Sequence, residues 1–124
     1  YSSVGTINTS DKTEKKNILY DLSEYEYLFF NLKPTQYKLI NSKKDYYHLG
    51  FIAQDIEESL ININLSNSDF AALDKQPFYD EEGNFIKFNY GLNYHEFIAL
   101  NTHMIQKLYK RVEQLEQQVF LLTK

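Results

Sequence analysis

The clearest pattern of apolar and polar positions lies at the C-terminal end, where residues 92–124 predict one long amphipathic helix. From Ile98 onward, apolar residues recur in alternating steps of three and four, the spacing of heptad positions a and d. Between 107 and 118 the apolar stripe is confined to a and d, apart from Tyr109, as in a coiled-coil seam. The seam residues are Ile98, Asn101, Ile105, Leu108, Val112, Leu115, Val119 and Leu122. We therefore expect the chain to work as an oligomer.

The predicted helix is about 50 Å long at 1.5 Å per residue, too long for the preceding residues to cover. Near its start, Phe97, Leu100 and Met104 broaden the stripe, so this part is expected to pack on its own body. Docking of the entire helix on its own domain is the alternative. Arg111 at g and Glu116 at the next e stand where neighbouring helices exchange charge. Branched residues at a with Leu at d favour two strands, and the polar residue at d fits a dimer or a trimer.

Upstream of this helix, short helical and β-prone segments alternate. Asp11 and Glu14 have capping-box spacing, so a helix is expected from Asp11, nearly continuous with a second helix over 21–32 that stops at Pro34. The remaining predicted elements are a strand pair (36–40 with 46–51), a brief helix (53–60), a loop (62–69) and a hairpin (78–90) that turns at 82–84. The predicted fold class is α+β: a small body of helices and β-hairpins carrying a long C-terminal helix.

Composition narrows the possible functions. The 124 residues suffice for one domain with an extension, and 16% aromatic content is typical of a folded chain. The net charge of −4 argues against nucleic acid and membrane partners, since there is no broad positive field. No cysteine is present, which excludes disulfides, thiol nucleophiles and zinc–thiolate sites. The chain begins at Tyr1 and not at Met, which favours the C-terminal part of a longer protein.

One group of residues could form a nucleophile: Ser10 and Asp11, followed by Lys15. A neutral lysine can serve as the base for a serine hydroxyl, and burial or neighbouring cations favour the neutral form. Residues five apart on a regular helix point about 140° apart. Ser10 must therefore precede the helix, or the lysine must come from another subunit. The alternative is that the serine and the aspartate only cap a helix.

Other candidate sites are weaker. The three histidines, His48, His95 and His103, lack a metal-binding spacing, so neither a metal nor any other cofactor is expected. The acidic residues 80–82 fall at the predicted turn without the ligand spacing of a calcium loop, which favours a solvated cluster.

The order of these motifs resembles a known family, the intramolecular chaperone and auto-processing domain at the C-terminal end of phage endosialidases, tail spikes and neck appendages. Three stretches carry the resemblance: SDKTEKKNI at 10–18, HLGFIAQDIEE at 48–58 and LNYHEFIALNTHMIQKL at 92–108. The GFIAQ block is the most specific. Residues 62–89 match poorly, and Ser59-Leu60-Ile61 stands where the family often has a proline.

The resemblance implies a homotrimer that guides the folding of an upstream fibre segment of the same polypeptide and then cuts itself off. The implied scissile bond is Thr9–Ser10, with Ser10 and Lys15 as the catalytic pair, Asp11 as the acid of the motif and His48 as a further processing residue. The implied organisation is an upstream end (1–9), a chaperone body (10–91) and a trimeric coiled-coil helix (92–124). The implied location is a virion tail or appendage precursor assembled in the host cytoplasm, with the chaperone absent from the mature particle.

Two other functions stay open on the sequence. The first is a purely structural trimerisation or capping domain in which Ser10 only caps a helix. The second is a receptor- or glycan-binding tip that uses some of the 11 tyrosines.

Overall fold

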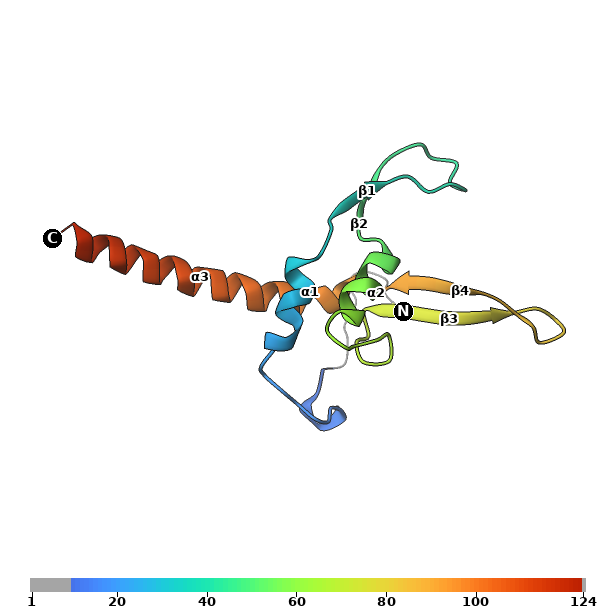
Figure 1. Cartoon of the computed structure of the whole chain (residues 1–124), viewed down its shortest axis with the longest axis horizontal. Coiled ribbons are helices and arrows are strands. Elements are labelled where there is room, and N and C mark those ends of the chain that lie inside the picture. Colours follow the sequence, from blue (N-terminus) through green and yellow to red (C-terminus); the bar gives the residue numbers. More distant parts are fainter. Residues whose placement is uncertain (1–9, 124) are drawn as a thin grey trace.

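The computed structural model describes residues 10–123. Figure 1 shows a small body from which helix α3 (Phe97–Leu122) projects in one direction and a long β-hairpin in the opposite direction. A second, shorter hairpin leaves the body at an angle to both. This arrangement bears out the predicted α+β class with a long C-terminal helix.

The N-terminal helices are much shorter than predicted. The segment after Asp11 is a single 3₁₀ turn, Lys12–Glu14, and the second helical stretch comprises a 3₁₀ turn, Ser23–Tyr25, and the five-residue helix α1 (Glu26–Phe30). The two stretches are not continuous, because Asn17 adopts a left-handed φ of 52° between them. Short helices need tertiary packing to be stable, and residues 10–21 are all exposed.

Two antiparallel hairpins form separate two-stranded sheets. The shorter one pairs β1 (Thr35–Tyr37) with β2 (His48–Gly50), as the predicted strand pair required, although both strands are shorter than expected. The longer one pairs β3 (Leu73–Tyr79) with β4 (Phe85–Leu92), which confirms the predicted hairpin and extends it toward the body.

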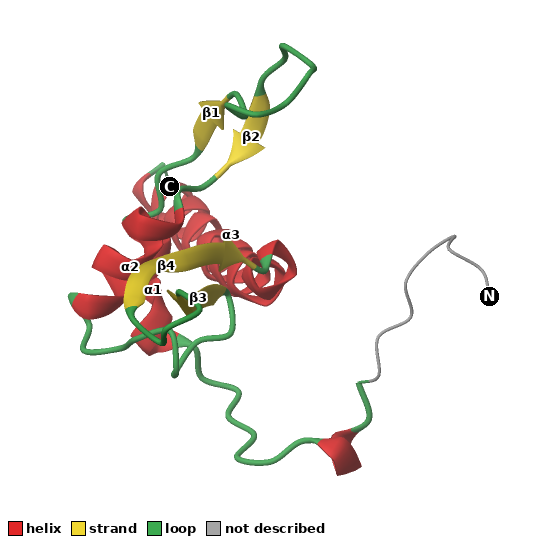
Figure 2. Ribbon diagram, turned by 90° about the vertical axis from the view of Figure 1, so that its right-hand side faces the viewer, coloured by secondary structure: helices red, strands yellow, loops and turns green. Residues whose placement is uncertain are grey.

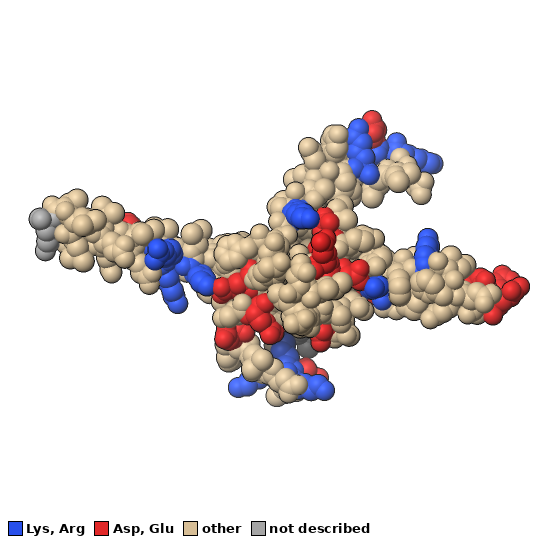
Figure 3. Space-filling view, in the orientation of Figure 1, with Lys and Arg blue, Asp and Glu red and all other residues tan. Residues whose placement is uncertain are grey.

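The turn of the longer hairpin explains the acidic cluster at residues 80–82. The Oδ1 atom of Asp80 accepts hydrogen bonds from the backbone N–H groups of Glu82 and Asn84, at 2.9 and 2.8 Å. These bonds, chiefly the one from Asn84, hold the pKa of Asp80 below its ordinary value. Gly83 takes a φ of 85°, which glycine adopts without steric cost. This carboxylate therefore shapes the turn, and Figure 3 shows the acidic tip of the hairpin exposed.

The core lies where helix α2 (Ala53–Ile61) meets α1, the base of the long hairpin and the start of α3. Ile56 and Leu60, four residues apart as predicted, are almost completely buried. The ion pair of Lys75 with Glu57, at 2.7 Å, holds the hairpin against α2, and the hydroxyl of Tyr90 donates to the same carboxylate. The buried apolar residues are Leu28, Ile56, Leu60, Ala72, Leu73, Phe97, Leu100 and Met104.

Helix α3 begins five residues later than predicted, because Leu92 still belongs to β4 and the N–H of Asn93 bonds to the carbonyl of Ala72. Its 26 residues span roughly 39 Å at 1.5 Å per residue. The broad stripe at its start is buried on the body, as the sequence predicted, and from Ile105 onward the described side chains are exposed. The helix therefore has a docked part and a projecting part.

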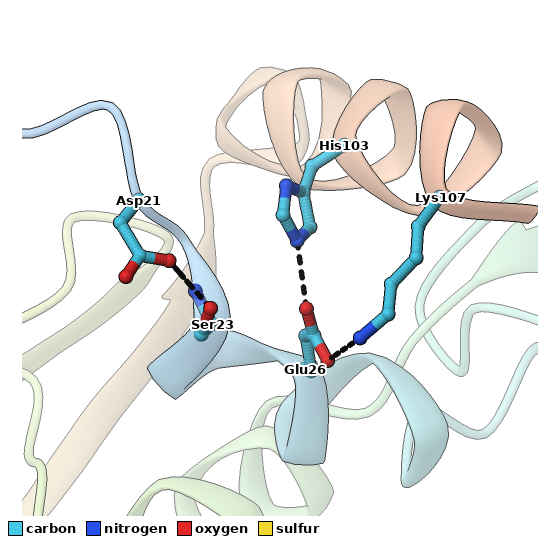
Figure 4. Close-up of polar contacts among 5 residues, drawn as sticks. All are labelled: Asp21, Ser23, Glu26, His103 and Lys107. Carbon is cyan, nitrogen blue, oxygen red and sulfur yellow. Dashed lines mark hydrogen bonds and ion pairs between the residues drawn. The ribbon is translucent and has the colours of Figure 1, made fainter. Parts of the chain in front are cut away.

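A polar cluster fastens α1 to α3 (Figure 4). Both carboxylate oxygens of Glu26 are used: one lies 2.9 Å from Nε2 of His103, and the other accepts from Nζ of Lys107 at 2.5 Å. The bond from Lys107, followed by that from His103, holds the pKa of Glu26 below its ordinary value. We refer to these three residues as the α1–α3 clasp.

Candidate active site

Ser10 and Lys15 lie in direct contact. Nζ of Lys15 is 2.6 Å from Oγ of Ser10, within hydrogen-bond distance. Ser10 precedes the 3₁₀ turn Lys12–Glu14, and Lys15 follows it in an extended conformation. The predicted geometric condition is thus met within one chain, because the pair does not lie on a regular helix.

The turn between the pair is closed by Asp11. Its Oδ1 atom accepts hydrogen bonds from the backbone N–H and the hydroxyl of Thr13, both at 2.9 Å. The backbone bond is the main reason that the pKa of Asp11 lies below its ordinary value. The cap of this turn is therefore the aspartate, and the hydroxyl of Ser10 contacts Lys15 instead.

The pair is exposed to solvent. Figure 2 shows the 3₁₀ turn at the end of a long loop, away from the helices and sheets of the body. A charged lysine donates to the hydroxyl oxygen, whereas a neutral one can accept its proton. Within one described chain, the arrangement brings a hydroxyl and an amine into contact but does not bury them. Thr9, on the other side of the predicted scissile bond, lies outside the described residues.

His48 is not brought to this pair within one chain. It lies in β2, where its ring stacks on Tyr37 with centroids 5.7 Å apart and forms a T-shaped contact with Tyr46 at 5.0 Å. Figure 1 shows the β1–β2 hairpin on the opposite side of the body from the blue N-terminal turn. The predicted catalytic residues therefore divide into a contacting pair and a distant histidine.

The GFIAQ block has a structural role that the sequence did not reveal. The hydroxyl of Tyr94 lies against the backbone of Phe51, accepting from its N–H at 3.1 Å and donating to its carbonyl at 3.3 Å. A Cβ atom built on Gly50 would lie only 2.4 Å from that hydroxyl oxygen, so a larger residue would displace the tyrosine. The glycine thus allows the end of β2 to approach the 3₁₀ turn Tyr94–Glu96, which precedes α3.

The predicted seam residues share one exposed face of α3. All eight are exposed in the single chain, from Val112 and Leu115 at 46 and 43% to Leu122 at 85%. A row of exposed aliphatic side chains of this length is typical of a surface that is covered in an assembly. The polar Asn101 is the one member of the row that is not aliphatic, and from Ile105 the row is aliphatic to Leu122.

Among residues 10–123, no group of three or more histidines and carboxylates is placed to hold a metal ion. Within that same range, no helix has the length and apolarity needed to cross a bilayer. Sequence reasoning missed Glu26 and Tyr94, whose partners lie as far as 81 and 43 residues away. No local spacing signals such pairs.

The sequence and the fold of this chain are similar to those of known proteins. Residues 10–65 match the sequence model of the peptidase S74 family, the chaperone of endosialidase, which confirms the resemblance seen in the sequence. No curated protein matches the chain. The fold is similar to the "crystal structure of a novel intramolecular chaperon", with a TM-score of 0.66 and 23% identity over 82% of this chain and 99% of that one.

A second solved structure is the carboxy-terminal domain of the bacteriophage T5 L-shaped tail fibre with its intramolecular chaperone domain. It has a TM-score of 0.56 and 18% identity, and the match covers 96% of this chain. The chain spans 33% of that structure's length. At these identities the two structures support the fold.

Proposed function

Because residues 10–65 match the sequence model of the chaperone of endosialidase, we propose that the chain is a self-cleaving intramolecular chaperone. It trimerises through the seam of α3, helps to fold an upstream segment of a phage fibre or appendage, and then releases itself by cleavage at Thr9–Ser10. The observation that carries the proposal is the 2.6 Å contact between Ser10 and Lys15, reached without help from the rest of the body. In this proposal residues 10–91 form the chaperone body and 92–124 the trimerisation segment, which contains helix α3.

The proposed chemistry follows from the positions of the pair. The hydroxyl oxygen of Ser10 attacks the carbonyl carbon of Thr9, while neutral Lys15 takes the hydroxyl proton. The Thr9–Ser10 peptide bond then breaks, and the lysine returns the proton to the departing amine of Ser10. Water hydrolyses the resulting ester, which frees the Thr9 carboxylate and restores the hydroxyl. Holding the nucleophile and base in contact supplies part of the rate.

Assembly completes the site in this proposal. A lysine serves as a base only in its neutral form, and burial in a low-dielectric environment favours that form. The pair is exposed in the described part of one chain, and in this proposal a neighbouring subunit supplies the cover. The distance between the β1–β2 hairpin and the turn means that His48 reaches the pair only from another subunit. Cleavage would then report that three chains have assembled correctly.

The test is a comparison of masses under denaturing conditions. A precursor that includes an upstream fibre segment should yield a fragment beginning at Ser10, and Ser10→Ala should leave the chain intact. A double substitution, Val112→Asp with Leu115→Asp, should separate the chains and stop cleavage. A chain that stays intact under all conditions would favour a purely structural trimerisation domain. A monomer that cleaves itself would refute the requirement for assembly.

A further inference from the structure

An apolar groove of about 340 Å³ lies between α1 and the projecting part of α3. Phe30, on the α1 side of the groove, is 71% exposed although α1 packs on α3. The residues that line the groove are Phe29, Phe30, Met104, Ile105, Lys107, Leu108 and Arg111. Two of these residues are basic, and Figure 3 shows basic side chains on the part of α3 next to the body. Part of the groove wall, Ile105 and Leu108, belongs to the proposed seam.

The heptad register places the groove on one flank of that seam. Met104 and Arg111 occupy g positions, and Lys107 occupies c, so the groove lies on the g side. In a parallel coiled coil, a g residue faces the e residue five positions later on the neighbouring helix, as Arg111 faces Glu116 of the partner subunit. The same offset from Met104 leads to Tyr109 of the partner subunit.

Tyr109 is the one apolar residue between 107 and 118 that departs from the a and d positions, and it is 68% exposed. Its e position lies on the opposite flank of the seam from the g side, so it cannot enter the groove of its own chain. An exposed aromatic ring and an exposed apolar groove thus lie at complementary positions of one register.

We propose that the groove of each copy receives Tyr109 of the partner subunit. The inference rests on the proposed function, because it requires parallel helices. In a closed trimer each chain offers one groove and one tyrosine, so three identical contacts complete the ring. The tyrosine ring gains apolar contact with Phe30 and Met104, and Arg111 supplies a cation for the ring face or the phenol oxygen. Because Phe30 belongs to α1, this contact couples the folding of the body to the assembly of the helices.

Chemical cross-linking tests the contact directly, because the chain has no cysteine of its own. The variant Phe30→Cys with Tyr109→Cys, treated with a short bis-maleimide, should give covalent dimers and trimers on a denaturing gel. The control is Phe30→Cys with Lys110→Cys, in which the second cysteine occupies the outward f position. It should stay monomeric under the same treatment. Equal cross-linking of both variants would overturn the proposal.

A second measurement does not depend on cysteines. Tyr109→Ala should raise the dissociation constant of the trimer by roughly tenfold or more, whereas Tyr109→Phe should stay close to wild type. Tyr47→Ala, at an exposed tyrosine of the short hairpin, is the matched control and should not change it. A trimer equally stable with Ala and Phe at position 109 overturns this inference and leaves the proposed function standing. Wild-type chains that form no trimer in light scattering would contradict the proposed function itself.

Discussion

The Ser10–Lys15 pair and the α1–α3 clasp are both polar contacts to a lysine, but they are built in opposite ways. The pair joins residues five positions apart through one 3₁₀ turn and remains exposed. The clasp joins Glu26 to Lys107, 81 positions away, and its carboxylate is partly buried between two helices. A contact made within one turn forms without the body, but it is not shielded from solvent by packing against the body. A contact made by packing has that shielding and depends on the entire fold.

The largest expected effect is on the rate of cleavage and comes from a substitution of Lys15. Lys15→Arg keeps the positive charge and the reach but cannot lose its proton, so cleavage should slow by about a hundredfold or more. A time course of fragment release on denaturing gels measures this rate. Lys16→Arg, at the next residue, is the control and should cleave normally. Cleavage of Lys15→Arg at the wild-type rate would show that this lysine is not the base.

Substitutions in the packed core should lower the stability of the fold according to how deeply the side chain is buried. Leu60→Ala removes a completely buried side chain and should lower the free energy of unfolding by about 2–5 kcal/mol. The neighbouring Ile61 is 61% exposed, and Ile61→Ala should change it by less than about 0.5 kcal/mol. Denaturant unfolding at one fixed protein concentration compares the two. Equal losses would mean that α2 packs through another face.

The clasp should show a pH dependence with a defined sign. The pKa of Glu26 is lowered in the folded chain, so its contribution to stability is present above the ordinary value of 4.5 and is lost as the pH falls through the lowered pKa. Glu26→Gln should therefore be less stable than wild type at pH 7, and the difference should shrink as the pH falls below 4.5. Unfolding by denaturant at a series of pH values measures this.

Glu24→Gln provides the control for the clasp, since Glu24 lies two residues earlier and is exposed. Its stability should follow the wild-type curve across the same pH range. A constant difference between Glu26→Gln and wild type at every pH would mean that the lost contact is not electrostatic.

The smallest expected effect concerns the cap of the 3₁₀ turn Lys12–Glu14, which separates Ser10 from Lys15. Asp11→Ala removes the acceptor for both bonds from Thr13 and should slow cleavage severalfold, because the turn that joins the pair becomes less ordered. The melting temperature should not change, since the turn has no packed contact with the core. Thr13→Val, which loses only the hydroxyl bond, should have the weaker effect. A lower melting temperature in Asp11→Ala would indicate that the turn docks on the body.

Prediction from sequence succeeded where the relevant residues lie close together. The strand pair, the hairpin and the spacing of Ile56 and Leu60 each follow from residues within one element or its turn. It was wrong for the nearly continuous N-terminal helix, because residues 10–21 are exposed in the described structure, and a short helix there would lack the packing that sustains α1.

The same division applies to the candidate site. The sequence predicted that Ser10 and Lys15 meet within one chain only if Ser10 precedes the helix. Ser10 does precede the 3₁₀ turn, and the two side chains are in contact. The separation of His48 from the pair was not predictable, since only the path of the chain around the body places β2 on the far side. The requirement for glycine at position 50 likewise depends on Tyr94, which the fold brings to it.

By itself, the sequence determined the heptad face of α3, the broader apolar stripe at its start and the local hairpins, because each depends on spacings of a few residues along one element or its turn. Only the tertiary structure decided which partners Glu26 takes, where His48 lies relative to Ser10 and Lys15, and where a groove remains beside the seam. These depend on contacts between segments up to 81 residues apart, whose geometry is set by packing around the core.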